Sequence, residues 1–237
     1  MKKLFLLLLP VFFSCSNDKK ATAVAEEIKE APLKIIDKVL GSFVGDFGDN
    51  KITLLITRAQ GDTLEGRSVV GGNDRPFTGT IIEKDGAWKI NAKEPGDDPN
   101  DGTFDFSIQT TDPNTVSGYW KPYDAKKTAK NYTLQRKQFV YKTDTGDYPQ
   151  ASQRELKPKE VENMMKEDLE WMRNEIFARH GYCFRKKSMR DMFEELDWYI
   201  PDNVDVRNKL TDIEKKNLAL IKRYEKYAEE YGDEYGR

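Results

Sequence analysis

The chain has few of the side chains that most often carry catalysis or hold metals. It contains one histidine, His180, and two cysteines, Cys15 and Cys183, which lie far apart in the sequence. Zinc sites need several Cys, His or carboxylate ligands at defined spacing, and no such cluster is present. The sequence therefore predicts neither a metal site nor a cofactor.

An excess of charge of one sign is also absent. The 39 basic and 41 acidic residues give a net charge of −2, whereas proteins that bind nucleic acids usually carry a basic patch. We therefore expect no nucleic-acid partner. The 27 aromatic residues (11 Tyr, 12 Phe and 4 Trp) supply enough apolar mass for real hydrophobic cores.

Long apolar runs are absent after the N-terminus. Lys2 and Lys3 precede an apolar run over residues 4–13, which is typical of a signal peptide and shorter than the roughly 20 residues needed to span a bilayer. Ser14 and Cys15 follow, and then a polar stretch. This segment resembles a bacterial lipoprotein signal, in which the cysteine is lipidated. It departs from that pattern at Phe12 and Phe13, and ordinary secretion is the alternative.

The resemblance implies a signal peptide over residues 1–15 with lipidation at Cys15. A lipid on Cys15 leaves Cys183 without a disulfide partner. We expect an exported, membrane-anchored lipoprotein of the outer membrane or cell surface. Residues 16–40, interrupted by Pro32, form the expected tether.

Residues 41–138 have the pattern of an antiparallel β domain. Phe104, Phe106 and Ile108 alternate with polar residues, as do Trp88, Ile90 and Ala92, and a period of two indicates strands with one buried face. Turn residues recur about every ten positions, so we expect about eight short strands. The predicted fold is a small antiparallel β-barrel, or a sandwich. An eight-stranded barrel is filled by side chains or holds one small ligand.

Two segments, one within this region and one directly after it, lack strand periodicity. The acidic stretch EPGDDPNDG, residues 94–102, does not match a calcium loop, because Pro99 and Ile108 occupy ligand positions three and twelve. We expect a solvated hairpin loop there. Residues 139–155 gather Gly, Pro, Asp and Ser and are predicted to be a linker.

Residues 156–237 change to helical periodicity. Pro158 is suited to a helix start, and an apolar face then runs through Val161, Met165, Leu169, Met172 and Ile176. Gly181 is expected to end this helix. Thr211 and Glu214 have the spacing of a capping box, which predicts the start of a long last helix.

Three blocks of this region, RNEIFARHGYCF, MFEELDWY and LTDIEKKNLALIKRYEK, resemble the YARHG domain. The motif itself reads FARHG over residues 177–181, with Phe177 in place of the first tyrosine. The resemblance covers residues 156–231. It implies an exported protein and no particular reaction. The whole chain is thus predicted to be α+β, with a β domain followed by a helical domain.

The motif residues support two interpretations. In the first, Asn174, Glu175, His180 and Asn217 form a structural polar cluster between two helices, in which Asn174 is the best partner for Asn217, and Glu175 pairs with Arg179. In the second, a recognition surface uses its arginines to bind a carboxylate or phosphate. That surface comprises Arg173, Asn174, Arg179, His180, Trp198 and Tyr199.

We expect a non-enzymatic binding or interaction role in the cell envelope and assign no catalytic residue. The expected partners are the membrane, through the lipid on Cys15, and a cell-envelope polymer or another envelope protein. The alternative is an envelope hydrolase that uses His180 with Cys183 or Glu175. A third hypothesis makes the helical domain a spacer that carries the barrel.

Overall fold

The computed structural model describes residues 36–231. The expected signal peptide, the lipidation site at Cys15 and most of the expected tether lie outside the described residues. Within residues 36–231, no helix is long and apolar enough to span a membrane.

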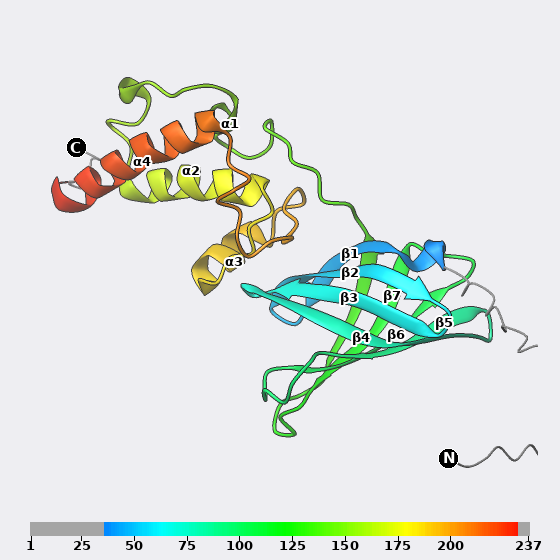
Figure 1. Cartoon of the computed structure of the whole chain (residues 1–237). Coiled ribbons are helices and arrows are strands. Elements are labelled where there is room, and N and C mark those ends of the chain that lie inside the picture. Colours follow the sequence, from blue (N-terminus) through cyan, green and yellow to red (C-terminus); the bar gives the residue numbers. More distant parts are fainter. Residues whose placement is uncertain (1–35, 232–237) are drawn as a thin grey trace, which may run out of the picture. The chain divides into compact units, whose positions relative to one another are not determined.

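The N-terminal part is a closed, eight-stranded antiparallel barrel in which each strand pairs with its sequence neighbours (Figure 1). The strands β1 and β8 close the barrel through the pairs Phe43–Arg136 and Val44–Gln135. This confirms the barrel and resolves the choice between barrel and sandwich. The strands are β1 (Gly41–Phe47), β2 (Asn50–Gln60), β3 (Thr63–Val70), β4 (Asn73–Lys84), β5 (Ala87–Lys93), β6 (Gly102–Gln109), β7 (Thr115–Pro122) and β8 (Lys130–Arg136).

The alternating residues fill the barrel as their period predicts. Phe104, Phe106 and Ile108 of β6 are buried, and the same holds for the inward-facing apolar residues of β2 and β5, which are Ile52, Leu54, Ile56, Trp88, Ile90 and Ala92. These side chains belong to one hydrophobic cluster that occupies the barrel interior. Burying one face of every strand against the others is the main source of stability for such a barrel.

One end of the barrel is closed by the residues that precede β1. The short 3-10 helix η1 (Asp37–Val39) places Val39 in the barrel core. The backbone N–H of Ile36 donates to the carbonyl of Ala59 at 3.0 Å, and Arg136 donates to the carbonyls of Lys38 and Pro113, each at 2.7 Å. The last residues of the expected tether are therefore part of the barrel.

The helical part contains α1 (Gln150–Gln153), η2 (Pro158–Glu160), α2 (Lys166–Arg179), α3 (Lys187–Phe193) and α4 (Asp212–Tyr231). The helix predicted to begin at Pro158 is in fact split, because a single 3-10 turn forms there and α2 begins only at Lys166. Val161 is nevertheless fully buried with Leu169 and Ile176. Met172 is buried as well, but Met165, the residue before α2, is exposed. Four of the five periodic apolar residues therefore mark the core correctly, whereas Met165 and the helix boundary were predicted wrongly.

Helices α2 and α4 lie side by side (Figure 1) and share one hydrophobic cluster. The helix α2 ends as predicted at Gly181, which has φ +73°. The N–H groups of Gly181 and Tyr182 donate to the carbonyls of Ala178 and Phe177, which is the Schellman pattern of a helix C-terminus. This cap fixes His180 at the end of the helix.

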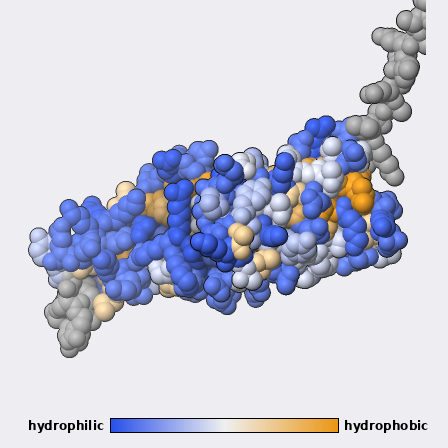
Figure 2. Space-filling view, turned by 90° about the horizontal axis from the view of Figure 1, so that it is seen from below, coloured by the Kyte–Doolittle hydropathy of each residue, from blue (hydrophilic) through white to orange (hydrophobic). Residues whose placement is uncertain are grey.

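The barrel and the helical part belong to one compact unit. The N–H of Lys51 donates to Glu194 at 2.9 Å, and the N–H of Gly72 donates to the sulfur of Cys183 at 3.1 Å. The face shown in Figure 2 is mostly hydrophilic, with small separate hydrophobic patches.

Candidate functional site

Glu214 and His180 form the centre of a buried polar network in the helical part. Both side chains are almost completely buried, His180 being 4 % exposed, and His180 Nε2 lies 2.7 Å from Glu214 Oε2. The Glu214 carboxylate also accepts hydrogen bonds from Ser152 at 2.7 Å, Tyr141 at 3.0 Å and the N–H of Thr211 at 2.9 Å. The Glu214 carboxylate therefore links α4 to α2 and to residues 141–152, which precede α2 in the chain.

Two opposing effects act on the pKa of Glu214. Burial works to raise the pKa, but the hydrogen bonds from His180, Thr211 and Ser152 together hold it below its usual value. The carboxylate is therefore ionised at neutral pH and acts only as an acceptor, so that His180 Nε2 is the donor of their hydrogen bond. The His180 ring also stacks on Tyr141, with centroids 4.3 Å apart.

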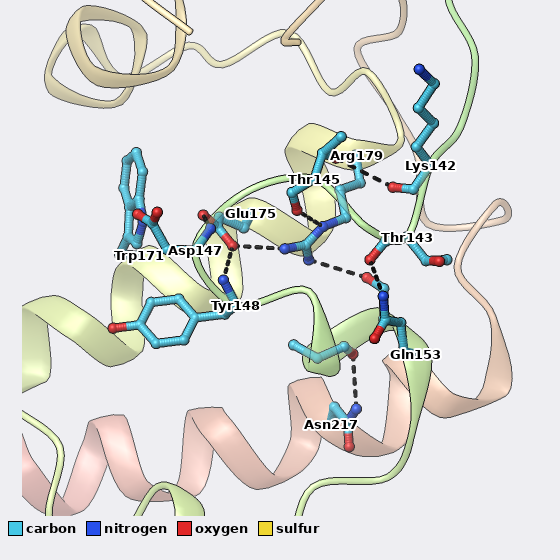
Figure 3. Close-up of polar contacts among 12 residues, drawn as sticks. Lys142, Thr143, Thr145, Asp147, Tyr148, Gln153, Trp171, Glu175, Arg179 and Asn217 are labelled. Atoms are coloured by element: carbon cyan, nitrogen blue, oxygen red, sulfur yellow. Dashed lines mark hydrogen bonds and ion pairs between the residues drawn. The ribbon is translucent and has the colours of Figure 1, made fainter.

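Arg179, the other polar residue of the motif, is held by a second carboxylate. It is 2 % exposed, and its Nη2 lies 2.7 Å from Oε2 of Glu175, which confirms the predicted pairing along the helix. Its remaining donors reach the carbonyl of Thr145 at 2.8 Å and the hydroxyl of Ser152 at 3.2 Å. Figure 3 shows the guanidinium between Glu175 and Thr145.

Glu175 in turn binds the backbone of the segment before the helices. Its two oxygens accept from the N–H groups of Asp147 at 2.6 Å and Tyr148 at 2.9 Å. The Trp171 indole donates to Asp147 at 3.0 Å on the same side of α2 (Figure 3). The motif helix therefore fixes residues 145–148 through both side-chain and backbone groups.

These contacts correct the expectation that residues 139–155 are a linker. The segment contains α1, its Ala151 is fully buried in the helical core, and its polar groups are the partners of Arg179, Glu175 and Glu214. Its Gly, Pro, Asp and Ser residues are those of an ordered irregular segment. Composition alone does not separate such a segment from a linker.

Asn217 is buried as predicted, but its partners differ from the prediction. Its side chain accepts from the N–H of Leu156 at 2.8 Å and donates to the carbonyls of Ala151 at 2.8 Å and Arg154 at 2.7 Å, so it binds backbone and not Asn174. Figure 3 shows Asn217 on α4 below this segment. Asn174 instead contacts Arg173 and the sulfur of Met189.

The structure does not bring the six residues of the predicted recognition surface together as one exposed surface. Asn174, Arg179, His180 and Tyr199 are buried. Arg173 does make the bidentate contact with a carboxylate, but its partner is Glu225 on α4, at 2.8 and 3.0 Å. Trp198 packs edge-on against Phe193 and Tyr199. The donors of Arg173 and Arg179 are therefore used within the fold.

The residues of the hydrolase alternative are also engaged elsewhere. Cys183 is fully buried, its sulfur accepts from the N–H of Gly72, and burial raises the pKa of its thiol to about 11. A nucleophilic cysteine needs the thiolate near neutral pH. Among the described residues, neither Cys183 nor Glu175 is hydrogen-bonded to His180.

A second polar site lies in the mouth of the barrel, at the end opposite η1. The loops β1–β2, β3–β4, β5–β6 and β7–β8 meet at this end because successive strands alternate in direction. Together with Arg190 of α3 they surround a cavity of about 460 Å³, which is within the usual range for small-molecule sites. Phe47, Phe104 and Trp120 form its aromatic lining.

Glu94 is one of two buried acids that line this cavity, at 5 % exposed. It accepts hydrogen bonds from Ser68 at 3.2 Å, from the N–H of Gly102 at 2.8 Å and from the Trp120 indole at 3.2 Å. Burial raises its pKa above the usual value, although these hydrogen bonds oppose the shift. Its carboxylate thus lies within the cavity in a fixed orientation.

Asp101 is the second buried acid, and it pairs with Arg75 at the cavity wall. The expected solvated loop over residues 94–102 therefore has buried acids at both ends, while Asp97, Asp98 and Asn100 between them are exposed. The sequence did contain a signal for Glu94, because it continues the inward series of Trp88, Ile90 and Ala92. No comparable period exists for Asp101, whose burial depends on the loop conformation.

Comparison with protein families finds the YARHG domain over residues 145–226. No curated protein and no solved structure matches the chain. The match begins at residue 145, whereas we expected it to begin at residue 156. Its first residue, Thr145, accepts a hydrogen bond from Arg179 through its carbonyl. A YARHG domain is consistent with an extracellular or periplasmic protein. The chain therefore contains a YARHG domain over residues 145–226, which follows a closed β-barrel.

Proposed function

We propose that this protein is a lipid-anchored binding protein of the cell envelope, whose ligand site is the mouth of the barrel. The observation that carries the proposal is the cavity of about 460 Å³ with a fixed, buried Glu94 and three aromatic side chains. A concave site with apolar walls and a few convergent polar groups is the usual form of a small-molecule site. The other barrel end is closed by η1.

The helical domain has a structural role in this proposal. The polar groups of Arg179 and Asn217 and Nε2 of His180 are used within the domain, so none of these groups is available for a ligand without breaking a buried hydrogen bond. Such a break costs about 1–3 kcal/mol for each group left unpaired. The motif thus stabilises the domain and holds residues 141–154 against α2 and α4.

The ligand site is tested by NMR on the isotope-labelled full chain. Soluble fragments from an enzymatic digest of the cell envelope are added, and backbone amide shifts are followed. We expect the shifts to concentrate in the four loops of the mouth, residues 48–50, 71–73, 94–102 and 123–130. Shifts confined to the helical domain, or no shifts at all, would contradict the proposal.

The anchor is tested separately by fractionation of cells that make the Cys15→Ser variant. Loss of the lipidation site should move the protein from the membrane fraction to the soluble fraction, because one lipidated residue is the only proposed anchor. Ser16→Ala is the matched control and should leave the protein at the membrane. Retention of the Cys15→Ser variant in the membrane fraction would contradict the proposed anchor.

A further inference from the structure

We propose that the barrel mouth binds a neutral saccharide unit, with Trp120 as the aromatic platform and Glu94 as a fixed hydrogen-bond acceptor. This inference rests on the proposed function and names the chemical class of its ligand. It follows from four features of the cavity: its charge balance, its polar groups, its aromatic side chains and the rigidity of its rim.

The charged side chains of the cavity balance one another. Arg75, Lys130 and Arg190 face it, together with Glu94, Asp98 and Asp101. Arg75 is paired with Asp101, and the ammonium group of Lys130 lies 4.7 Å from the centre of the Phe47 ring. A site for a charged ligand usually presents an excess of the opposite charge. The balance here favours a neutral ligand.

The uncharged polar groups offer donors and acceptors together. The amides of Asn50, Asn73 and Asn100 line the cavity, as does the hydroxyl of Ser68. Each amide carries both a donor and an acceptor group. Oδ1 of Asn50 already accepts from Arg190, and the Asn100 amide is bonded to Lys127 and Asp98, so Nδ2 of Asn50 and the amide of Asn73 are the groups offered to a ligand. A ligand with several hydroxyl groups matches this set, because each hydroxyl both donates and accepts.

Glu94 adds an acceptor whose geometry is set before binding. Oε2 accepts from Gly102 and Trp120, whereas Oε1 accepts, among residues 36–231, only from Ser68. A carboxylate oxygen can accept two hydrogen bonds, so Oε1 retains one position for a ligand hydroxyl. A preorganised acceptor loses little conformational entropy on binding.

The aromatic side chains supply an apolar surface beside these polar groups. Trp120 is half-buried, and its ring meets Phe47 edge-on with centroids 5.7 Å apart. Its indole nitrogen is fixed by Glu94. The electron-rich face of an indole attracts the weakly positive C–H groups that a sugar ring presents between its hydroxyls. Aromatic and hydroxyl-binding groups thus occur in one cavity.

The rim of the cavity is tied together by the loops that form it. The hydroxyl of Tyr123 donates to the carbonyl of Glu94 at 2.8 Å, and its N–H donates to the carbonyl of Asp101 at 2.8 Å. Lys127 reaches Asn100 at 2.5 Å. These bonds join the β7–β8 loop to the β5–β6 loop, which carries four polar residues of the cavity: Glu94, Asp98, Asn100 and Asp101. The site is therefore largely formed before a ligand arrives.

The test is isothermal titration of the full chain with three neutral tetrasaccharides: cellotetraose, maltotetraose and chitotetraose. We expect at least one to bind with a millimolar or lower Kd and the Trp120→Ala and Glu94→Gln variants to bind at least ten-fold more weakly. Glu94→Gln retains the shape of the side chain, and its amide can donate to Ser68 while its oxygen accepts from Gly102. Trp171→Phe, which changes an indole outside the barrel, is the matched control and should bind as the wild type does.

Asn73→Ala should leave the stability of the barrel unchanged, because Asn73 is exposed and the substitution keeps the backbone of the strand. It should weaken binding of the same tetrasaccharide. Full-strength binding to Asn73→Ala, Glu94→Gln and Trp120→Ala together would place the sugar elsewhere and overturn the inference.

Two further ligands separate this inference from the proposed function. Tetragalacturonate and spermine serve as an anionic and a cationic probe. If one of them shifts the amides of the mouth and none of the neutral sugars binds, the saccharide inference fails and the binding function stands. If neither charged probe, neutral sugar nor envelope digest shifts the mouth, both fail.

A saccharide ligand can be a sugar unit within a polymer or a free oligosaccharide. Co-sedimentation with insoluble peptidoglycan sacculi and with cellulose distinguishes these two sources. Sedimentation that Glu94→Gln weakens supports a sugar unit within a polymer. Binding of a tetrasaccharide without sedimentation supports a free oligosaccharide. Both results support the saccharide class.

Discussion

Two carboxylates determine what the motif residues do. Glu214 accepts from His180, and Glu175 pairs with Arg179, so each basic residue of the motif has an acidic partner in the core. Removing one member of such a pair leaves the other buried without its partner, which costs more than the pair itself contributes. The motif residues are therefore sensitive to substitution without being exposed.

The first prediction concerns His180→Ala. This substitution removes a donor from Glu214 and the stacking partner of Tyr141, and it should lower the free energy of unfolding by about 1–3 kcal/mol. Chemical denaturation of the full chain measures the change. Lys187→Ala is the control, because Lys187 belongs to an exposed ion pair and should change stability by less than about 1 kcal/mol. Equal effects of the two substitutions would rule out a structural role for His180.

The second prediction concerns acid. Because the pKa of Glu214 is below its usual value of 4.5 in the folded protein, the folded state favours the ionised form. This contribution is fully present above pH 4.5 and is lost as the pH falls through the lowered pKa. The wild type should therefore be more stable than Glu214→Gln at neutral pH, and the difference should shrink below pH 4.5. A difference that stays constant down to pH 3 would contradict the assignment.

At the scale of elements, the irregular segment before η2, residues 139–155, contributes to the core of the helical part as the helices do. Glu175 on α2 accepts from two successive N–H groups of this segment, and Asn217 on α4 binds backbone groups on either side of α1. These side chains replace the regular hydrogen bonds that the segment lacks. Side chains of α2 and α4 thus fix the conformation of a segment that has little secondary structure of its own.

The third prediction tests how closely this segment approaches α2. Gly146 has φ +86°, and a Cβ atom there would lie 2.6 Å from Oε1 of Glu175. Gly146→Ala should therefore both strain the backbone and displace the carboxylate from its partners. Gly86→Ala is the matched control, since Gly86 has φ +74° but nothing within 4 Å of an added Cβ. We expect Gly146→Ala to be the more destabilising by at least about 1 kcal/mol in thermal or chemical unfolding. Similar losses would mean that the segment is not held by Glu175.

At the scale of the whole molecule, the domain boundary follows from these contacts. The buried groups of Arg179, Glu175 and Glu214 find their partners among residues 141–152. Cutting the chain at residue 156 would remove these partners from Arg179, Glu175 and Glu214 and expose the surface that Ala151 and Tyr148 cover. The folding unit therefore begins before the first periodic helix.

The fourth prediction compares two fragments, 139–237 and 156–237. The longer fragment should show helical circular dichroism and a cooperative melting transition, whereas the shorter one should lose the cooperative transition. Adding the peptide 139–155 in trans to the shorter fragment should restore part of its helical signal. Cooperative folding of fragment 156–237 alone, with the same midpoint, would contradict this boundary.

The sequence by itself determined the local features. The period of two predicted the strands and their buried faces, Gly181 predicted the end of α2, and Thr211 and Glu214 predicted the start of α4, where their reciprocal bonds are found at 2.9 and 3.2 Å. The pair Glu175–Arg179 was also predictable, because residues four apart on a helix are neighbours. All of these depend on contacts within a few residues of one another.

Only the tertiary structure decided the partners that lie far apart in the chain. His180 and Glu214 are 34 residues apart, and Ser152 and Glu214 are 62 apart. Glu94 meets Ser68 and Trp120, each 26 residues away, only after the barrel has closed. A sequence pattern indicates that such a side chain is buried, but its partner depends on how strands and helices pack. The ordered segment 139–155 was missed for the same reason, since it takes its structure from the side chains of α2 and α4.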